Sequence, residues 1–152
     1  MLDSFDRAIL RILQRDNKTP QRTIAEAVNL SAAAVQRRIA AMEAAGVIEA
    51  NVAIVAPQAL GMSITAIVEV RLKDERSTTV DGAKALFLSA PEVQQCYYVT
   101  GGISFVLVIV TSDMVEYEAI TRRLFANNDA VSSFQSLIAL DRVKASAEIM
   151  VP

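Results

Sequence analysis

The spacing of apolar residues changes near residue 61, and this change limits the chain to a small set of folds. Before it, Phe5, Ile9 and Leu13 recur at helical intervals and form one stripe. After it, apolar and polar residues alternate over residues 64–72, as in a strand with one solvated face. A helical part followed by a part that contains strands predicts an α+β fold.

This change of pattern also suggests the domain boundaries. We expect a helical domain over residues 1–47, a linker over 48–61 and a second domain over 62–152. The linker contains Pro57 and ends near Gly61. The stretch VIEANVAIV at its start could form a hinge strand.

Turn and cap residues divide the first domain into three helices, over residues 3–15, 20–28 and 31–45. Thr19 fits the N-cap of the second helix, because proline follows it. Asn29 lies at a turn, where its side chain tolerates the left-handed conformation. Ser31 fits the N-cap of the third helix, and Gly46 ends it. Two helices joined by a tight turn form a helix-turn-helix.

The second domain is predicted to have the element order β-α-β-β-α-β. The expected strands cover residues 64–72, 93–100, 105–111 and 131–143, and the expected helices lie near 80–90 and 113–126. Gly101-Gly102 fits a hairpin turn between the two middle strands. The strand over 105–111 is apolar on both faces, so we expect both faces to be covered. This order is that of the ferredoxin-like split βαβ fold.

Composition excludes several classes of function. The chain has no histidine and a single cysteine, Cys96, so an intrinsic zinc site and an internal disulfide are not expected. No catalytic set of residues is present, so we do not expect an enzyme or a cofactor. The N-terminus lacks the features of a signal peptide, and the apolar run 105–110 is too short to span a bilayer. We therefore expect a cytoplasmic protein that does not contact a membrane. Cys96 is expected to be a buried, inert thiol, with a redox sensor as the alternative.

Net charge is −2, but the two parts of the chain differ. Residues 1–60 contain 7 basic and 6 acidic residues, whereas residues 61–152 contain 8 basic and 11 acidic ones. The first part is therefore the one that we expect to meet a polyanion.

The predicted third helix has two adjacent arginines on a surface made mostly of alanine. On a helical wheel the inner face is Val35, Ile39 and Met42, and the opposite face is Ala33, Arg37, Ala40 and Ala44. Such a low surface lets a helix enter the major groove, where arginine or glutamine can read base edges. Residues at the start of the second helix could hold phosphates. The candidate DNA-binding residues are Thr19, Gln21, Arg22, Ser31, Ala33, Gln36, Arg37 and Arg38.

Two simpler interpretations stay open. An alanine-rich helix is stable without any partner, so the three helices could be a plain packing module. Arg38 lies nearer the core than Arg37 does, and it could pair with Asp3 or Asp6 instead of reading a base.

Three stretches of the chain resemble the leucine-responsive regulator/asparagine regulator (Lrp/AsnC) family of transcription factors. They are LDSFDRAILRIL, AVNLSAAAVQRRIAAMEAAGVI and CYYVTGGISFVL. The opening motif is matched by Leu2, Asp3, Asp6, Ile9, Leu10 and Leu13. The recognition-helix motif is matched by Leu30, Ser31, Val35, Arg38, Glu43, Gly46 and Ile48.

The resemblance covers essentially the whole chain and implies an N-terminal winged helix-turn-helix and a ferredoxin-like effector (RAM) domain. It implies sequence-specific binding to double-stranded DNA, with residues 31–45 as the recognition helix. It also implies a small-molecule effector, usually an amino acid, and assembly with copies of the same chain. Family members dimerise through their effector-domain sheets and often form tetramers or octamers.

The family's effector loop normally reads Gly-Asp-aromatic-Asp between the two central strands. Here the matching residues are Gly101-Gly102-Ile103-Ser104, so the glycine is kept and both acidic positions are lost. The resemblance links Asp113 to the effector response and places Ser136 where the family often has small hydroxyl residues. The candidate effector-binding residues are Tyr98, Thr100, Gly101, Gly102, Ile103, Ser104, Asp113 and Ser136.

The altered loop leaves alternatives open. The chain could respond to a ligand other than an amino acid, or organise DNA without an effector. The Gly101-Gly102 pair could also be a hairpin turn with no ligand. A small-molecule enzyme or sensor with a vestigial helix-turn-helix is a further alternative, and the missing catalytic set argues against the enzyme.

Overall fold

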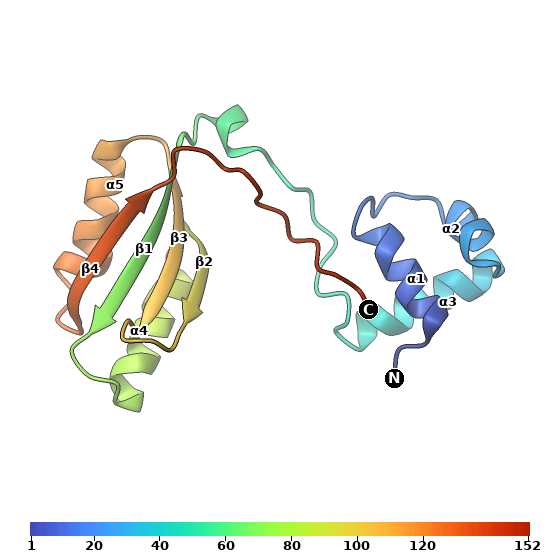
Figure 1. Ribbon diagram of the computed structural model, residues 1–152, viewed down its shortest axis with the longest axis horizontal. Helices are drawn as coiled ribbons and strands as arrows, with labels where there is room; N and C mark the ends of the chain where they lie inside the picture. The colour runs from blue at the N-terminus through green and yellow to red at the C-terminus, as the bar shows by residue number, and fades with distance from the viewer. The chain divides into compact units, whose positions relative to one another are not determined.

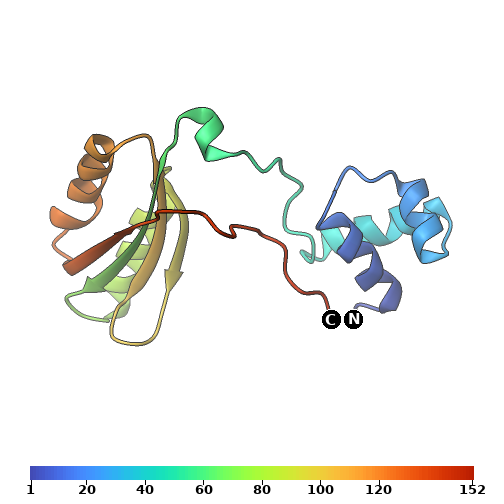
Figure 2. The ribbon, with the colours of Figure 1, turned by 45° about the horizontal axis from the view of Figure 1, so that its top comes forward.

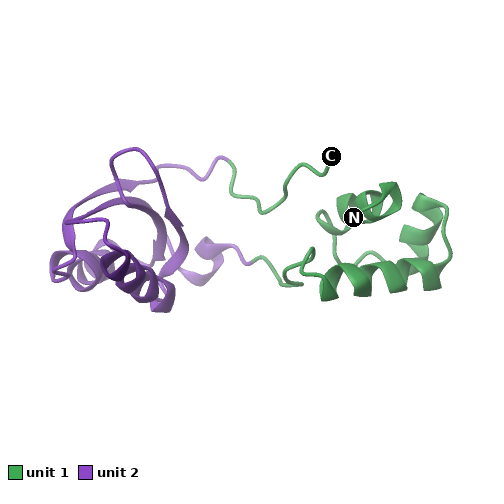
Figure 3. Cartoon of the chain, turned by 90° about the horizontal axis from the view of Figure 1, so that it is seen from below, with its two compact units in different colours: residues 1–54, 144–152 green, residues 55–143 purple.

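The computed structural model describes residues 1–152 and divides into two compact units (Figure 3). Unit 1 contains residues 1–54 together with the C-terminal segment 144–152, and unit 2 contains residues 55–143. The first unit is therefore built from both ends of the chain.

Unit 1 is built around three helices, as predicted. They are α1 (Ser4–Leu13), α2 (Gln21–Val28) and α3 (Ala32–Ala44) (Figure 1). Ile9, Ile24, Val35 and Met42 are almost fully buried between them. Each comes from the apolar stripe of its helix, so burial of these stripes holds the unit together.

Local hydrogen bonds define the ends of these helices. Asp3 caps α1 through a capping box, in which the Asp3 and Asp6 carboxylates each accept from the other's backbone N–H. The Ser31 hydroxyl accepts from the N–H of Ala34 and caps α3, as predicted. Asn29, with φ of 56°, makes the left-handed turn between α2 and α3, also as predicted.

The predicted cap of α2 is wrong. The N-cap position is occupied by Pro20, and α2 begins at Gln21 without a side-chain cap. The Thr19 hydroxyl instead donates to the carbonyl of Asp16 at 2.8 Å. This bond orients the hydroxyl towards the preceding turn, and its oxygen accepts from no N–H of α2.

Side chains of α1 hold the C-terminal segment within unit 1. The amide of Gln14 donates to the carbonyl of Ile149 at 3.0 Å and accepts from its N–H at 2.9 Å. Arg11 donates to the carbonyls of Val151 and Pro152 at 3.3 and 3.0 Å. These bonds make the end of the chain part of the helical unit, which the sequence pattern did not predict.

No strand forms over residues 47–55, where the sequence suggested one. Val47 and Ile48 form a bend in which both N–H groups donate to the carbonyl of Met42, and residues 49–55 form no backbone ladder with another segment. A strand needs a paired neighbour for its N–H and C=O groups, and a single chain supplies none here. The segment is followed by a short 3-10 helix, Pro57–Leu60, and by Gly61 with φ of 73°.

Unit 2 has a four-stranded antiparallel sheet with two helices, in the predicted ferredoxin-like order. The strands are β1 (Ile64–Leu72), β2 (Val93–Tyr98), β3 (Phe105–Thr111) and β4 (Val131–Ile138), in the order β2-β3-β1-β4. Helix α4 (Ser77–Ser89) and helix α5 (Met114–Thr121), which continues as a π-helical turn (Arg122–Ala126), cover one face (Figure 2).

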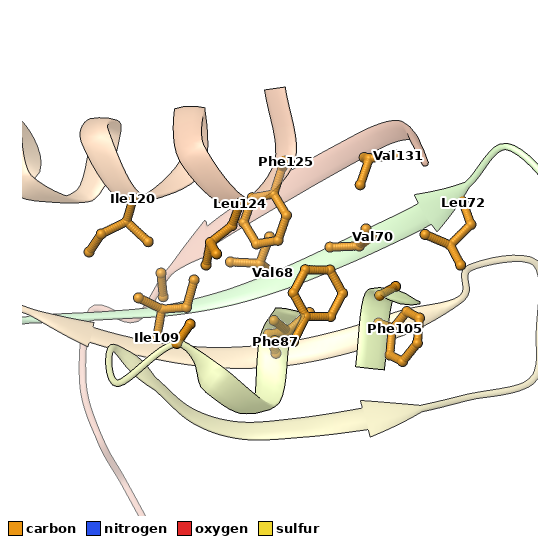
Figure 4. Close-up of a cluster of buried hydrophobic side chains, with 14 of the residues drawn as sticks. Val68, Val70, Leu72, Phe87, Phe105, Ile109, Ile120, Leu124, Phe125 and Val131 are labelled. Carbon is orange, nitrogen blue, oxygen red and sulfur yellow. The ribbon is translucent and has the colours of Figure 1, made fainter. Parts of the chain in front are cut away.

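The core of unit 2 lies between this face and the two helices (Figure 4). Phe87 of α4 is fully buried and makes edge-on contacts with Phe105 of β3 and Phe125 of the π-helical turn, with ring centroids 5.3 and 5.7 Å apart. Val68 and Val70 of β1 face the same core. Alternate residues of β1 and β3 point away from this core, towards the other face of the sheet. Both helices pack on the core side, so no helix covers that other face.

Two predicted strands are longer than those observed. The fourth ends at Ile138, opposite Ala66 of β1, instead of at residue 143, and only one further backbone bond, from the N–H of Ala139 to the carbonyl of Thr65 at 2.9 Å, follows it. The second ends at Tyr98 instead of residue 100, where the chain enters the loop that precedes β3.

Candidate DNA-binding face and ligand pocket

Helix α3 presents the alanine-rich surface that its sequence predicted. Val35 and Met42 are buried against α1 and α2, whereas Ala33, Arg37 and Ala40 are exposed. The Arg37 guanidinium forms no ion pair and no hydrogen bond within the chain. A free guanidinium among methyl groups can approach a partner without first breaking an internal bond.

The other predicted DNA-binding residues differ in how free they are. Gln21 and Gln36 are exposed. Arg22 is also exposed, and it pairs on its own helix with Glu26 at 3.4 Å. Such a surface pair is weak, so it leaves Arg22 available. Ser31 caps α3, as described above.

Arg38 has a role inside unit 1. Its Nη1 donates to Asp3 at 2.8 Å and to Asp6 at 2.7 Å, and its guanidinium lies 5.5 Å from the centre of the Phe5 ring. The prediction that Arg38 pairs with Asp3 or Asp6 is confirmed, since it binds both. The N–H of Asp6 and the Arg38 guanidinium lower the pKa of Asp3, and the two acids raise the pKa of Arg38. Arg38 thus joins α3 to the start of α1.

A hollow of about 580 Å³ opens in unit 2 beside the loop between β2 and β3. Five predicted effector residues line it: Tyr98, Gly101, Gly102, Ile103 and Ser104. The end of β1 and the loop that follows it contribute five more residues: Arg71, Leu72, Lys73, Asp74 and Glu75. Val99 and Ser132 complete the lining. The hollow lies where two loops at one end of the sheet meet.

The β2–β3 loop is anchored through Ser104, which is buried. Its N–H donates to the carbonyl of Val70 at 2.8 Å, and its hydroxyl accepts from the N–H of Leu72 at 2.9 Å. Gly101 and Gly102 have φ of 109° and 93°, a conformation that side chains disfavour. Glycine is therefore needed at both positions for the loop to take this path.

Glu75 is the functional candidate that sequence reasoning missed. One carboxylate oxygen accepts from the Tyr98 hydroxyl at 2.7 Å, and the other accepts from the Ser104 hydroxyl at 2.5 Å. These bonds lower the pKa of Glu75, with Ser104 contributing more than Tyr98, and the carboxylate raises the pKa of Tyr98. The available signal was the acidic pair Asp74-Glu75 directly after the first strand, but its relation to residue 104 depends on the register of β1 and β3.

Three predicted effector residues lie outside the lining of this hollow. Thr100 is exposed in the same loop. Asp113 caps α5, accepting from the N–H of Glu116 at 2.8 Å. Ser136 lies on β4, 2.5 Å from the hydroxyl of Tyr117 on α5. The structure thus brings together the loop candidates and separates them from Asp113 and Ser136.

The prediction of a buried thiol at Cys96 is wrong, because this side chain is exposed. Cys96 pairs with Leu107 and shares the helix-covered face with it. However, β2 is an edge strand, so its outer side has no neighbour. Partial burial still raises the pKa of the thiol.

Comparison with known proteins decides the family. Residues 2–43 match the model of the AsnC-type helix-turn-helix domain, and residues 65–149 match that of the Lrp/AsnC ligand binding domain. The chain belongs to the Lrp/AsnC family. It is a transcriptional regulator with a helix-turn-helix for DNA and a ligand-binding domain.

Relatives of this regulator cover almost its full length. It is 41% identical over 150 residues to an uncharacterized HTH-type transcriptional regulator of Sinorhizobium fredii, covering 99% of this chain and 89% of that one. It is 33% identical over 143 residues to the proline dehydrogenase transcriptional activator of Rhodobacter capsulatus, covering 94% and 93%. A crystal structure of an AsnC family transcriptional regulator from Agrobacterium tumefaciens superposes with a TM-score of 0.91 at 30% identity, covering 98% of this chain and 97% of that one.

These relatives are named as regulators, and none of those three names describes an enzyme. None of the helices of this regulator combines the length and the apolar character needed to span a membrane.

Proposed function

We propose that α3 enters the DNA major groove and that Arg37 reads base edges there. The observation that carries this proposal is the free, exposed guanidinium of Arg37 on the alanine-rich surface of the second helix of a helix-turn-helix. Gln36 extends the same reading surface. Gln21 and Arg22, at the start of α2, hold phosphates, supported there by the uncapped N–H groups of the helix.

The regulator acts as a dimer or a larger assembly through the open face of its sheet. This face contains the apolar side chains Ile67, Val106, Val108, Val110 and Leu137, together with Tyr97. No helix of the same chain covers them, and a second sheet packed on this face would remove them from water. Two helix-turn-helix units then bind one DNA site together, which compensates for the modest positive charge of each unit.

The hollow at Gly101–Ser104 is the effector site, and its ligand is a small molecule of the amino-acid class. The supporting feature is a preformed hollow lined by backbone amides, hydroxyl groups and charges of both signs. Binding changes DNA affinity only as far as the ligand distinguishes between arrangements of the assembly. Because its DNA target lies there, the regulator acts in the cytoplasm.

A gel-shift titration on DNA from upstream of its own gene tests the DNA-binding proposal. Arg37→Ala should weaken specific binding by about ten- to hundredfold, the value of one bidentate contact with a base. The matched control is Arg122→Ala, which removes an exposed arginine that pairs with Glu118 on α5. Equal shifts for Arg37→Ala and the wild type would overturn the assignment of α3.

A repeat of the shift with each common amino acid tests the effector. A specific shift that one amino acid strengthens or releases identifies the effector. A specific shift that no amino acid changes would leave the chain as an architectural DNA-organising protein, or as one with a different ligand.

A further inference from the structure

The hollow at Gly101–Ser104 has a balanced set of charges. Its lining includes two cations, Arg71 and Lys73, and two anions, Asp74 and Glu75. A zwitterion, which carries one charge of each sign, needs both kinds of group at a suitable separation. The loop itself has no acid, because its positions 102 and 104 are glycine and serine. The negative charge of the site must therefore come from the neighbouring β1–α4 loop.

Of the two acids in that loop, Glu75 is the one fixed against the effector loop. Its carboxylate accepts hydrogen bonds from the hydroxyl groups of Tyr98 and Ser104, one on each oxygen. Each carboxylate oxygen has two lone pairs, so two acceptor positions stay available. The same hydrogen bonds lower the pKa of Glu75, so the group is ionised at neutral pH.

Asp74 is used differently. Its carboxylate accepts from the N–H of Arg76 at 3.0 Å, and a hydrogen bond with Thr79 contributes most to lowering its pKa. Both partners belong to the start of α4. Asp74 thus holds its own loop onto the helix, whereas Glu75 faces the residues predicted for the effector.

The opposite end of a zwitterion also has a receptor in this hollow. The N–H groups of Gly101 and Gly102 donate to no carbonyl or side chain of the protein. Arg71 and Lys73 form no ion pair. Free amides in a glycine turn, with cations nearby, form a site for a carboxylate.

We infer that Glu75 binds the ammonium group of an α-amino acid ligand, in place of the acids that the effector loop lacks. This inference rests on the proposed effector site and assigns the orientation of its ligand. The ammonium group meets Glu75, and the ligand's carboxylate meets the amides of Gly101 and Gly102. A ligand without an ammonium group leaves the charge of Glu75 without a partner.

Calorimetric titration of the full chain tests this role. The probes are the twenty common L-amino acids, followed by the deaminated analogue of the tightest binder, in which hydrogen replaces the ammonium group. In the wild type the analogue should bind about ten- to hundredfold more weakly, because a charge-assisted hydrogen bond is lost. Glu75→Gln should weaken binding of the amino acid by a similar factor and leave the affinity for the analogue nearly unchanged.

Two variants separate binding from loop structure. Asp74→Asn removes the same charge from the adjacent residue of the same lining, and it should keep most of the affinity. Tyr98→Phe removes one bond that holds Glu75 but keeps its charge, so this variant should still prefer the amino acid over the analogue. If Glu75→Gln proves unstable, the other two variants decide whether Glu75 binds the ammonium group. Both Tyr98→Phe and Asp74→Asn should still bind the amino acid more tightly than the deaminated analogue, and loss of this preference in either variant would overturn the role of Glu75.

The remaining outcomes distinguish this inference from the proposed function. If Glu75→Gln binds the amino acid as tightly as the wild type, the ammonium group is held elsewhere, and the effector proposal stands without the inference. If no amino acid binds the wild type, both the amino-acid effector and the role of Glu75 are overturned. The gel-shift test of Arg37 is independent of either result.

Discussion

Arg38 of α3 donates to Asp6 of α1 at 2.7 Å, and the same nitrogen also donates to Asp3 at 2.8 Å. Both acids also cap α1, so a single guanidinium bridges the two carboxylates that start this helix. Arg37, the adjacent residue, has no partner in the chain. Neighbouring arginines of one helix therefore serve packing and DNA recognition separately.

This relationship predicts different effects for the same substitution at the two positions. Arg38→Met keeps an apolar stem but leaves two carboxylates facing each other, so the amides of α1 should exchange with solvent faster. Arg37→Met should leave their exchange unchanged and weaken DNA binding. Hydrogen exchange measured by NMR checks the first effect, and gel shift checks the second. Faster exchange of the α1 amides in Arg37→Met, or an unchanged rate in Arg38→Met, would contradict this division of roles.

Alanine should have opposite effects at two glycines of unit 2. A Cβ at Gly102 or at Gly82 would meet no atom within 4 Å, so neither substitution causes a clash. Gly102 has φ of 93°, and alanine there should lower the free energy of unfolding by about 1–2 kcal/mol. Gly82 lies within α4, and alanine there should raise it by about 0.5–1 kcal/mol.

Urea unfolding of both variants measures these changes. Because the same atoms are added to open space at each site, backbone conformation alone accounts for a difference in sign. Destabilisation of similar size at both positions would show that the loop conformation at Gly102 is not what requires glycine.

Local signals predicted much of the fold. Asn29 and Ser31 act within a few residues of themselves, so the turn and the start of α3 could be read from sequence. The alternation in residues 64–72 predicted the face of β1 that is buried. Thr19 shows the limit of such reasoning, because its hydroxyl can turn towards the preceding turn or towards the helix, and the sequence does not rank the two orientations.

Features that depend on distant partners could not be predicted. Glu75 meets Ser104 only because β1 and β3 pair in a register that places Val70 opposite Phe105. Cys96 is exposed because β2 lies at the edge of the sheet, and strand order is not encoded in the local pattern. For the hollow at Gly101–Ser104, the sequence therefore predicted the residues of the β2–β3 loop and missed those of the β1–α4 loop.

Acid should destabilise unit 2 partly through Glu116. Its carboxylate accepts from the Thr111 hydroxyl and from the N–H and hydroxyl of Ser112, which lowers its pKa from 4.5 to about 2. The unfolded chain therefore takes up this proton at a higher pH than the folded one. The contribution of Glu116 to stability is complete above about pH 4.5 and is lost as pH falls towards about 2.

Comparison with Glu116→Gln isolates this contribution, because every other carboxyl group is common to both proteins. Urea unfolding followed by circular dichroism at a series of pH values should show the wild type losing more stability than the variant over that window. Parallel pH profiles for the two proteins would show that the Glu116 contacts do not favour its ionised form.

The end of the chain should be ordered by Gln14. Its side-chain oxygen accepts from the N–H of Ile149 at 2.9 Å, although both residues lie near the surface. A net bond of about 1 kcal/mol slows exchange of this amide by about fivefold, and Gln14→Ala should remove that protection. Gln21→Ala, an exposed glutamine on α2, is the matched control and should leave the Ile149 amide protected. NMR hydrogen exchange gives the answer directly: an Ile149 amide that is unprotected in the wild type, or still protected in Gln14→Ala, would mean that α1 does not hold the C-terminal segment in solution.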